Sequence, residues 1–331
     1  RSCLVGSEMC IRDRIYNIPV YLTIIFVVMA LLRVNDPVYA FLGKNTTQED
    51  IDRRREEFGL DRPFLTQYGE FLKRLAFFDF SQESWSRRGR KVSDEIAGAV
   101  IPTLSLTIPA LTLTSLISIF VGMISAFFRG RNLDRGLVFF AVLGMSISFL
   151  VYIILGQYFI AYLPQKYFES HDMKETWGSV WFAIQGYEPG LQHWFHYIML
   201  PVLISVIVAM GYDTRFYRAV MVEETGRDYI VTARSKGATQ SKIMFVHMLR
   251  NALIPIVTRI MITLPFLITG SILLEMYFNI PGMGKTLITA INEKNLPIIE
   301  TFTSLFAGLF ILSNILTDVL YAIVDPRVRL T

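Results

Sequence analysis

Long apolar stretches separated by charged segments dominate the pattern of the chain. A helix needs about 20 mostly apolar residues to cross about 30 Å of hydrocarbon, and it pairs its backbone polar groups internally. Stretches close to that length recur six times, and four of them carry no charged residue. They are residues 15–32, 99–128, 137–163, 197–212, 252–274 and 301–323. The pattern therefore predicts an all-α integral membrane protein with about six transmembrane helices.

Charged residues between these stretches indicate which side of the membrane each loop faces. Short loops rich in Lys and Arg lie on the cytoplasmic side. Three arginines fall within residues 129–135 and seven Lys and Arg within 213–251, whereas the loops after the third and fifth stretches hold two lysines each. We therefore expect both termini in the cytoplasm and residues 33–98 in an outer (periplasmic) domain between helices one and two.

This interpretation divides the chain into three parts. Residues 1–14 lack an apolar run, resemble translated sequencing-adapter sequence and contain both cysteines, so we expect a non-native stretch there. Residues 15–98 hold the first transmembrane helix and the outer domain, in which residues 47–58 predict a short capped helix. Residues 99–331 hold the other transmembrane helices and the cytoplasmic loop 213–251.

Composition agrees with the pattern and excludes several classes of protein. The chain is 53% hydrophobic and 18% charged, with a net charge of +4 and a mean hydropathy of +0.43, against about 25% charged residues in soluble domains. This excludes a disordered chain and a nucleic-acid binder and leaves membrane lipid as the surroundings. We expect no cofactor and no metal, because His193 and His196 lack a third ligand nearby and suit the membrane interface.

The loop between the fourth and fifth stretches is too amphipathic for a simple connector. Residues 222–233 predict one helix, Gly237 is placed to end it, and residues 241–253 predict another. A helix, a glycine and a second helix form a compact knob that fits a groove on a soluble partner. Taken alone, the pattern is a weak signal, and a basic loop that only fixes the topology is the preferred interpretation without further matches.

Five segments resemble one family, the inner-membrane permease subunits of ABC transporters in the dipeptide/oligopeptide/nickel branch. Residues 228–237 (DYIVTARSKG) resemble the coupling-loop motif of that branch, and residues 247–255 (HMLRNALIP) resemble the sequence that follows it. The other three segments are residues 59–68, 275–284 and 318–329. The resemblance covers essentially residues 15–329.

The resemblance implies a permease subunit of an ATP-driven importer in the bacterial inner membrane. The chain then forms half of a pathway for peptides or similar small solutes and is not itself an enzyme. Its partners are ABC ATPase subunits, a second, homologous permease in a heterodimer, and an extracytoplasmic solute-binding protein. The residues implied in coupling to the ATPase are Glu223, Asp228, Tyr229, Thr232, Ala233, Arg234, Lys236 and Gly237.

Alternative functions follow from other features of the chain. An ion-coupled secondary transporter or channel usually carries ionisable residues inside the membrane, and here the fifth and sixth stretches hold only Arg259 and Asp318. Arg259 could line a cavity or reach the cytoplasmic edge. A membrane scaffold is a third possibility, but it has no use for a docking loop. Residues 279–286 resemble a phosphate-binding loop that follows a strand-like apolar run, but Asn279 stands where that motif needs glycine.

Overall fold

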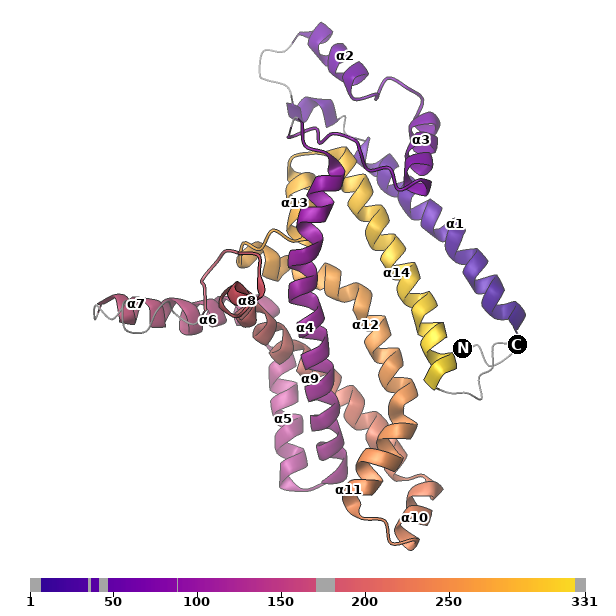
Figure 1. Cartoon of the computed structure of the whole chain (residues 1–331), viewed down its shortest axis with the longest axis vertical. Helices are drawn as coiled ribbons and strands as arrows, with labels where there is room; N and C mark the ends of the chain where they lie inside the picture. Colours follow the sequence, from indigo (N-terminus) through magenta and orange to yellow (C-terminus); the bar gives the residue numbers. More distant parts are fainter. Residues whose placement is uncertain (1–6, 35–36, 42–46, 88, 171–181, 325–331) are drawn as a thin grey trace. The chain divides into compact units, whose positions relative to one another are not determined.

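The computed structural model describes residues 7–34, 37–41, 47–87, 89–170 and 182–324, which form helices joined by short loops (Figure 1). Within these ranges extended backbone pairs only in an isolated bridge between Glu83 and Lys91, so the predicted all-α class is confirmed. The elements are α1 (Ser7–Leu32), η1 (Pro37–Phe41), α2 (Gln48–Glu57), α3 (Phe64–Ala76), α4 (Val92–Phe127), α5 (Asn132–Ser146), α6 (Phe149–Gly156), η2 (Gln157–Tyr162), α7 (Leu163–Ser170), α8 (Leu191–Tyr197), α9 (Met199–Thr225), α10 (Asp228–Ser235), α11 (Gln240–Lys242), η3 (Ile243–Met248), α12 (Leu249–Tyr277), α13 (Met283–Asn292) and α14 (Leu296–Val324).

Each of the six apolar stretches lies in helical structure. Four helical segments are long and apolar enough to cross a membrane, namely Val92–Phe127, Met199–Thr225, Gln240–Leu264 and Leu296–Thr317. The bent pair α5–α6 supplies a fifth if it counts as one span, and the apolar part of α1, Tyr16–Leu32, is shorter. The chain is therefore an integral membrane protein of several spans, and the count of six stays a prediction.

The third apolar stretch is not the single straight helix expected over residues 137–163. The chain turns by 92° between α5 and the helix that follows it. Ile147 and Ser148 both adopt extended ψ angles, 137° and 140°, which ends one helix and starts the next. The serines on either side of Ile147 carry no charge, so the break lies within an uncharged stretch and is visible in two backbone angles rather than in the charge pattern.

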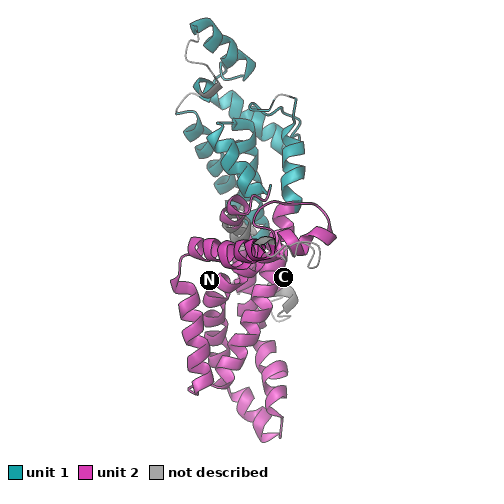
Figure 2. Ribbon diagram, turned by 90° about the vertical axis from the view of Figure 1, so that its left-hand side faces the viewer, with its two compact units in different colours: residues 1–101, 281–315, 331 teal, residues 102–280, 316–330 magenta. Residues whose placement is uncertain are grey.

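The structure divides into two compact units, coloured separately in Figure 2. The first unit comprises Arg1–Ile101 and Pro281–Ile315, together with Thr331. In it, α2 begins at the expected position after Thr47, and Phe71 of α3 packs against Ile25 and Met29 of α1. α1 begins at Ser7, within the stretch expected to be non-native, and residues 1–6 lie outside the described ranges.

The second unit comprises Pro102–Ile280 and Leu316–Leu330. Its helices α5 and α9 lie side by side (Figure 1), and Gly211 of α9 faces the backbone of α5 so closely that a Cβ would lie 2.7 Å from Ala141 O. A Cβ on Gly122 of α4 would likewise lie 3.0 Å from Arg218 N of α9. Small residues at both crossings let the helix backbones approach, as in other membrane helix pairs.

Candidate functional site

The loop after α9 forms the expected knob, but its first helix breaks earlier than the sequence indicated. The expected helix over 222–233 is wrong, because α9 ends at Thr225 and α10 begins at Asp228. Arg227 has extended backbone angles (φ −79°, ψ 146°) and serves as the N-cap of α10. The first helix of the knob is therefore the separate two-turn helix α10, which follows the end of α9 after a short link.

Gly237 ends α10 in the conformation that favours glycine. Its φ is +75°, a region that residues with a Cβ rarely adopt. Ala238 N donates to Ala233 O at 3.1 Å and Gly237 N donates to Arg234 O at 2.9 Å, the two bonds of a Schellman motif. A Cβ on Gly237 would meet nothing within 4 Å. The glycine is therefore required here by its backbone angle, and the surface around it is open.

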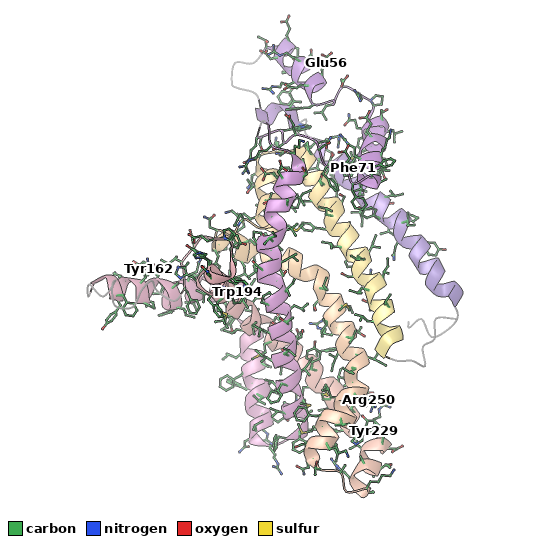
Figure 3. All side chains as sticks on the ribbon, viewed as in Figure 1. Glu56, Phe71, Tyr162, Trp194, Tyr229 and Arg250 are labelled. Carbon is green, nitrogen blue, oxygen red and sulfur yellow. The ribbon has the colours of Figure 1, made fainter. Side chains whose placement is uncertain are left out.

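α10 is anchored to the ends of the long helices by apolar contacts. Ile230 and Ala233 are buried in a cluster with Met123 of α4, Tyr217 of α9 and Met248 of η3. Figure 3 shows α10, with Tyr229 labelled, close to the start of α12, where Arg250 is labelled. A displacement of α10 would therefore act on side chains from α4, α9 and η3 together.

The eight residues implied in coupling do not share one environment. Tyr229 is half-buried and donates to Glu224 Oε2, and burial, followed by this bond to a carboxylate, raises the pKa of the Tyr229 hydroxyl. Ala233 is buried within the chain and packs the knob itself. The other six are exposed: Glu223, Asp228, Thr232, Arg234, Lys236 and Gly237.

Two further features of the knob were missed by sequence reasoning. Glu223 is not a free acid, because Arg227 Nη2 lies 2.6 Å from its Oε1. Val231 is 60% exposed and points away from the cluster that buries Ile230 and Ala233. An exposed valine in the middle of the amphipathic pattern was the available signal. It gives the outer face of α10 an apolar centre among Asp228, Thr232 and other polar residues.

A buried ion pair joins the start of α5 to α9, near the end of α9 that leads into the knob. Arg218 of α9 binds Asp134 of α5 with two parallel bonds, Nε to Oδ1 at 2.7 Å and Nη2 to Oδ2 at 2.8 Å. Ser125 of α4 donates to Oδ1 and the Gly130 backbone to Oδ2. Each carboxylate oxygen thus receives two donors, and three helices are tied together at one point.

Arg259 lies on the wall of a cavity of about 640 Å³ in the second unit. Its guanidinium approaches Asp213 of α9, with Nε 3.0 Å and Nη2 2.9 Å from Oδ1. It also lies over the Phe216 ring, 5.5 Å from the centroid. The sequence reasoning had placed Asp213 at the start of the loop, whereas α9 continues through it, so the pair is an acid and a base on two candidate spans.

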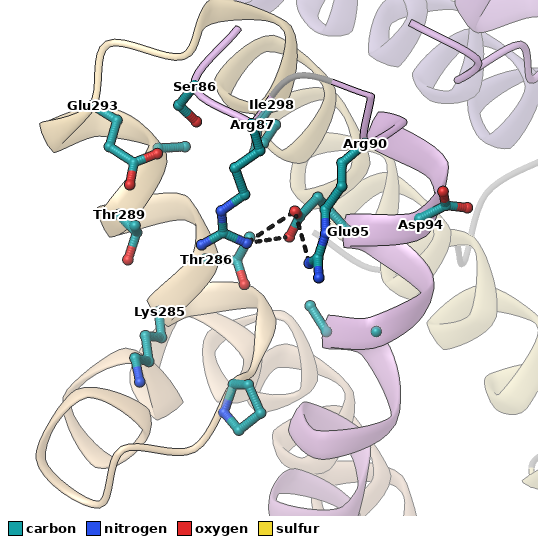
Figure 4. Close-up of a pocket in the computed structure, with 14 residues that line it drawn as sticks. Ser86, Arg87, Arg90, Asp94, Glu95, Lys285, Thr286, Thr289, Glu293 and Ile298 are labelled. Carbon is teal, nitrogen blue, oxygen red and sulfur yellow. Dashed lines mark hydrogen bonds and ion pairs between the residues drawn. The ribbon is translucent and has the colours of Figure 1, made fainter. Parts of the chain in front are cut away.

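A smaller pocket of about 300 Å³ lies in the first unit (Figure 4). Arg87 and Arg90 both reach the Glu95 carboxylate, at 2.9 Å and 3.4 Å, which offsets one of their two positive charges. Lys285 and Thr286 also line it. The apolar run before them is helix α12, as the fifth apolar stretch predicts, so the strand that precedes a phosphate-binding loop is absent here.

Sequence comparison with known proteins places this chain in one family. The sequence model of the binding-protein-dependent transport system inner membrane component matches residues 118–330. A putative peptide transport system permease protein of Brucella abortus (strain 2308) is 34% identical over 318 residues, which cover 94% of this chain and 96% of that protein. A probable peptide ABC transporter permease of Sinorhizobium fredii is 30% identical over 96% of this chain and 98% of its own length. A glutathione transport system permease of Shigella boydii serotype 4 is 33% identical over 89% of both chains.

Proposed function

We propose that α10 couples this chain to a separate ATPase subunit, so that ATP hydrolysis on that subunit moves the transmembrane helices. The chain belongs to the family of inner membrane components of binding-protein-dependent transport systems. It is a permease subunit of an ABC importer of the peptide branch and a multi-pass protein of the inner membrane. The family relationship does not favour the ion-coupled alternative. In this proposal a separate ATPase subunit hydrolyses the ATP, and the permease itself catalyses no reaction.

The observation that carries the proposal is the two-sided character of α10. Its inner face is fixed by buried Ile230 and Ala233, and its outer face presents Val231 between Asp228 and Thr232. A short helix held this way can enter a groove on a soluble subunit without losing its hold on the long helices. Exposed charge pairs contribute less than about 1 kcal/mol each, so the fit around Val231 dominates the docking.

The orientation and the remaining partners belong to the same proposal. The knob and both termini face the cytoplasm, since the loop 213–251 holds seven Lys and Arg. A second, homologous permease completes the pathway in a heterodimer, and a solute-binding protein delivers the solute from outside. The relatives are named for peptide and glutathione transport, and we infer peptides or similar small solutes as the cargo here.

The test of docking is a charge placed on the outer face of α10. Val231→Asp puts a carboxylate into the apolar centre of the contact, so we expect the ATPase subunits to be lost on purification and ATP-driven uptake by vesicles to fall at least tenfold. Gly237→Trp should do the same, because it strains the φ of +75° and adds bulk to the open surface.

The matched control is the same substitution at another exposed valine. Val34, 75% exposed in the first unit, lies outside the knob, and Val34→Asp should leave ATPase binding unchanged. Normal uptake by both knob variants would overturn the assignment of α10. Uptake driven by an ion gradient, with no ATPase subunit bound to the wild-type chain, would favour the secondary transporter.

A further inference from the structure

The two acid–base pairs of the second unit differ in how fully their hydrogen-bonding groups are used. Arg218 donates to both carboxylate oxygens of Asp134, and Ser125 and the Gly130 backbone each donate a further hydrogen bond to one of them. Such a pair is closed, because each carboxylate oxygen already receives two donors. It suits a structural role and offers no group for a ligand.

The Asp213–Arg259 pair in the cavity, by contrast, leaves some of its hydrogen-bonding groups unused. Arg259 directs both Nε and Nη2 at one oxygen, Oδ1 of Asp213. Among the described residues none donates to Oδ2 of Asp213 and none accepts from Nη1 of Arg259. One acceptor and one donor of opposite charge are therefore left beside each other on the cavity wall.

The rest of the cavity suits a small polar solute. Side chains of α4, α9 and α12 form its wall, together with the turn between α5 and α6. Its volume of about 640 Å³ falls in the range of small-molecule sites. Apolar residues such as Leu106 and Val208 alternate in it with hydroxyls such as those of Thr107, Thr114 and Ser205. Charge is thus confined to the Asp213–Arg259 pair.

We propose that Asp213 and Arg259 form a solute-recognition site selective for zwitterions, which are solutes carrying one carboxylate and one ammonium group. The solute carboxylate accepts a hydrogen bond from Nη1 of Arg259, and the solute ammonium donates one to Oδ2 of Asp213. The inference rests on the proposed function, in which solute passes this cavity. A charge inside a membrane protein is costly unless it is paired. A zwitterion adds two charges and pairs both, whereas a singly charged solute leaves the cavity with a net charge.

The test measures binding in this cavity without the solute-binding protein. The complete transporter, with its partner subunits, is placed in lipid nanodiscs in a Cys3→Ser, Cys10→Ser background, and Ser205→Cys supplies one thiol on the cavity wall. The readout is the rate at which a methanethiosulfonate reagent labels that thiol. The probes are dialanine, its N-acetyl form, which is an anion, and its C-terminal amide, which is a cation.

In the otherwise wild-type chain we expect dialanine to protect the thiol at concentrations about tenfold or more below those of either capped form, because each capped form loses one hydrogen bond to a charged group. Arg259→Met should abolish the preference for dialanine over its amide. Asp213→Asn should abolish the preference for dialanine over its N-acetyl form. Equal protection by all three probes, or preferences unchanged in both variants, would overturn the proposal.

A second variant keeps the test decisive if a single substitution prevents assembly. Asp213→Asn with Arg259→Met leaves no unpaired charge, so it should assemble and be protected alike by the three probes. If the transporter assembles and hydrolyses ATP but shows no preference, zwitterion selection fails and coupling through α10 stands. If wild-type chains bind no ATPase subunit, the coupling proposal fails, and protection measured on the permease chains still reports on the pair.

Discussion

At the scale of single residues, the Asp134–Arg218 pair lends itself to a direct energetic test. Asp134 is buried, with 5% of its side chain exposed, and it depends on Arg218 for one donor to each oxygen. Removing one partner of a buried pair leaves an uncompensated charge and typically costs about 3–5 kcal/mol. We expect Arg218→Met to lower the midpoint of thermal unfolding, followed by tryptophan fluorescence in detergent, whereas Asp134→Asn with Arg218→Met recovers much of the loss. A double variant no more stable than the single one would show that the pair acts through something other than charge.

The sequence predicted the role of a single residue where that role depends on the residue's own backbone. Gly237 was expected to end a helix, and it does so through its own backbone angle. The partner of Arg259 was not found, because Asp213 lies 46 positions away and meets it only when α9 and α12 pack together. Ala233 resembles a surface residue in its motif, and only the packing of α10 on neighbouring helices buries it.

At the scale of elements, the close crossing of α5 and α9 predicts opposite effects for two glycines of one helix pair. Gly211→Ala forces a Cβ to within 2.7 Å of Ala141 O, an overpacking that costs about 1–3 kcal/mol. Gly136 in α5 meets nothing within 4 Å, so Gly136→Ala should raise stability by up to about 1 kcal/mol through helix propensity. Thermal unfolding of the two purified variants distinguishes them. Equal shifts in the same direction would mean that the crossing tolerates a methyl group.

Hydropathy predicted where the helical segments lie but not where they bend or end. It placed all six apolar stretches in helical segments, because an apolar run of about 20 residues crosses the membrane as a helix, which pairs its backbone groups internally. It missed the 92° turn after α5, since Ile147 and Ser148 interrupt the helix without introducing a charged residue. It also ended the fourth helix at residue 212, whereas α9 continues to Thr225, because charged residues in a helix beyond the apolar stretch look like a loop.

At the scale of the whole molecule, docking and transmission should be separable, because different faces of α10 serve them. Val231 faces outward, whereas Ile230 is 1% exposed within the cluster that links α10 to α4, α9 and η3. Ile230→Ala leaves the outer face intact but opens a cavity under it, at a cost of about 2–5 kcal/mol in packing. We expect the variant to retain its ATPase subunits and much of their ATP hydrolysis while fewer solute molecules are imported per ATP consumed. Simultaneous measurement of phosphate release and solute uptake in proteoliposomes gives that ratio directly. A variant that lost hydrolysis and uptake in equal proportion, as Val231→Asp should, would mean that the buried face of α10 holds the helix in shape without transmitting its motion.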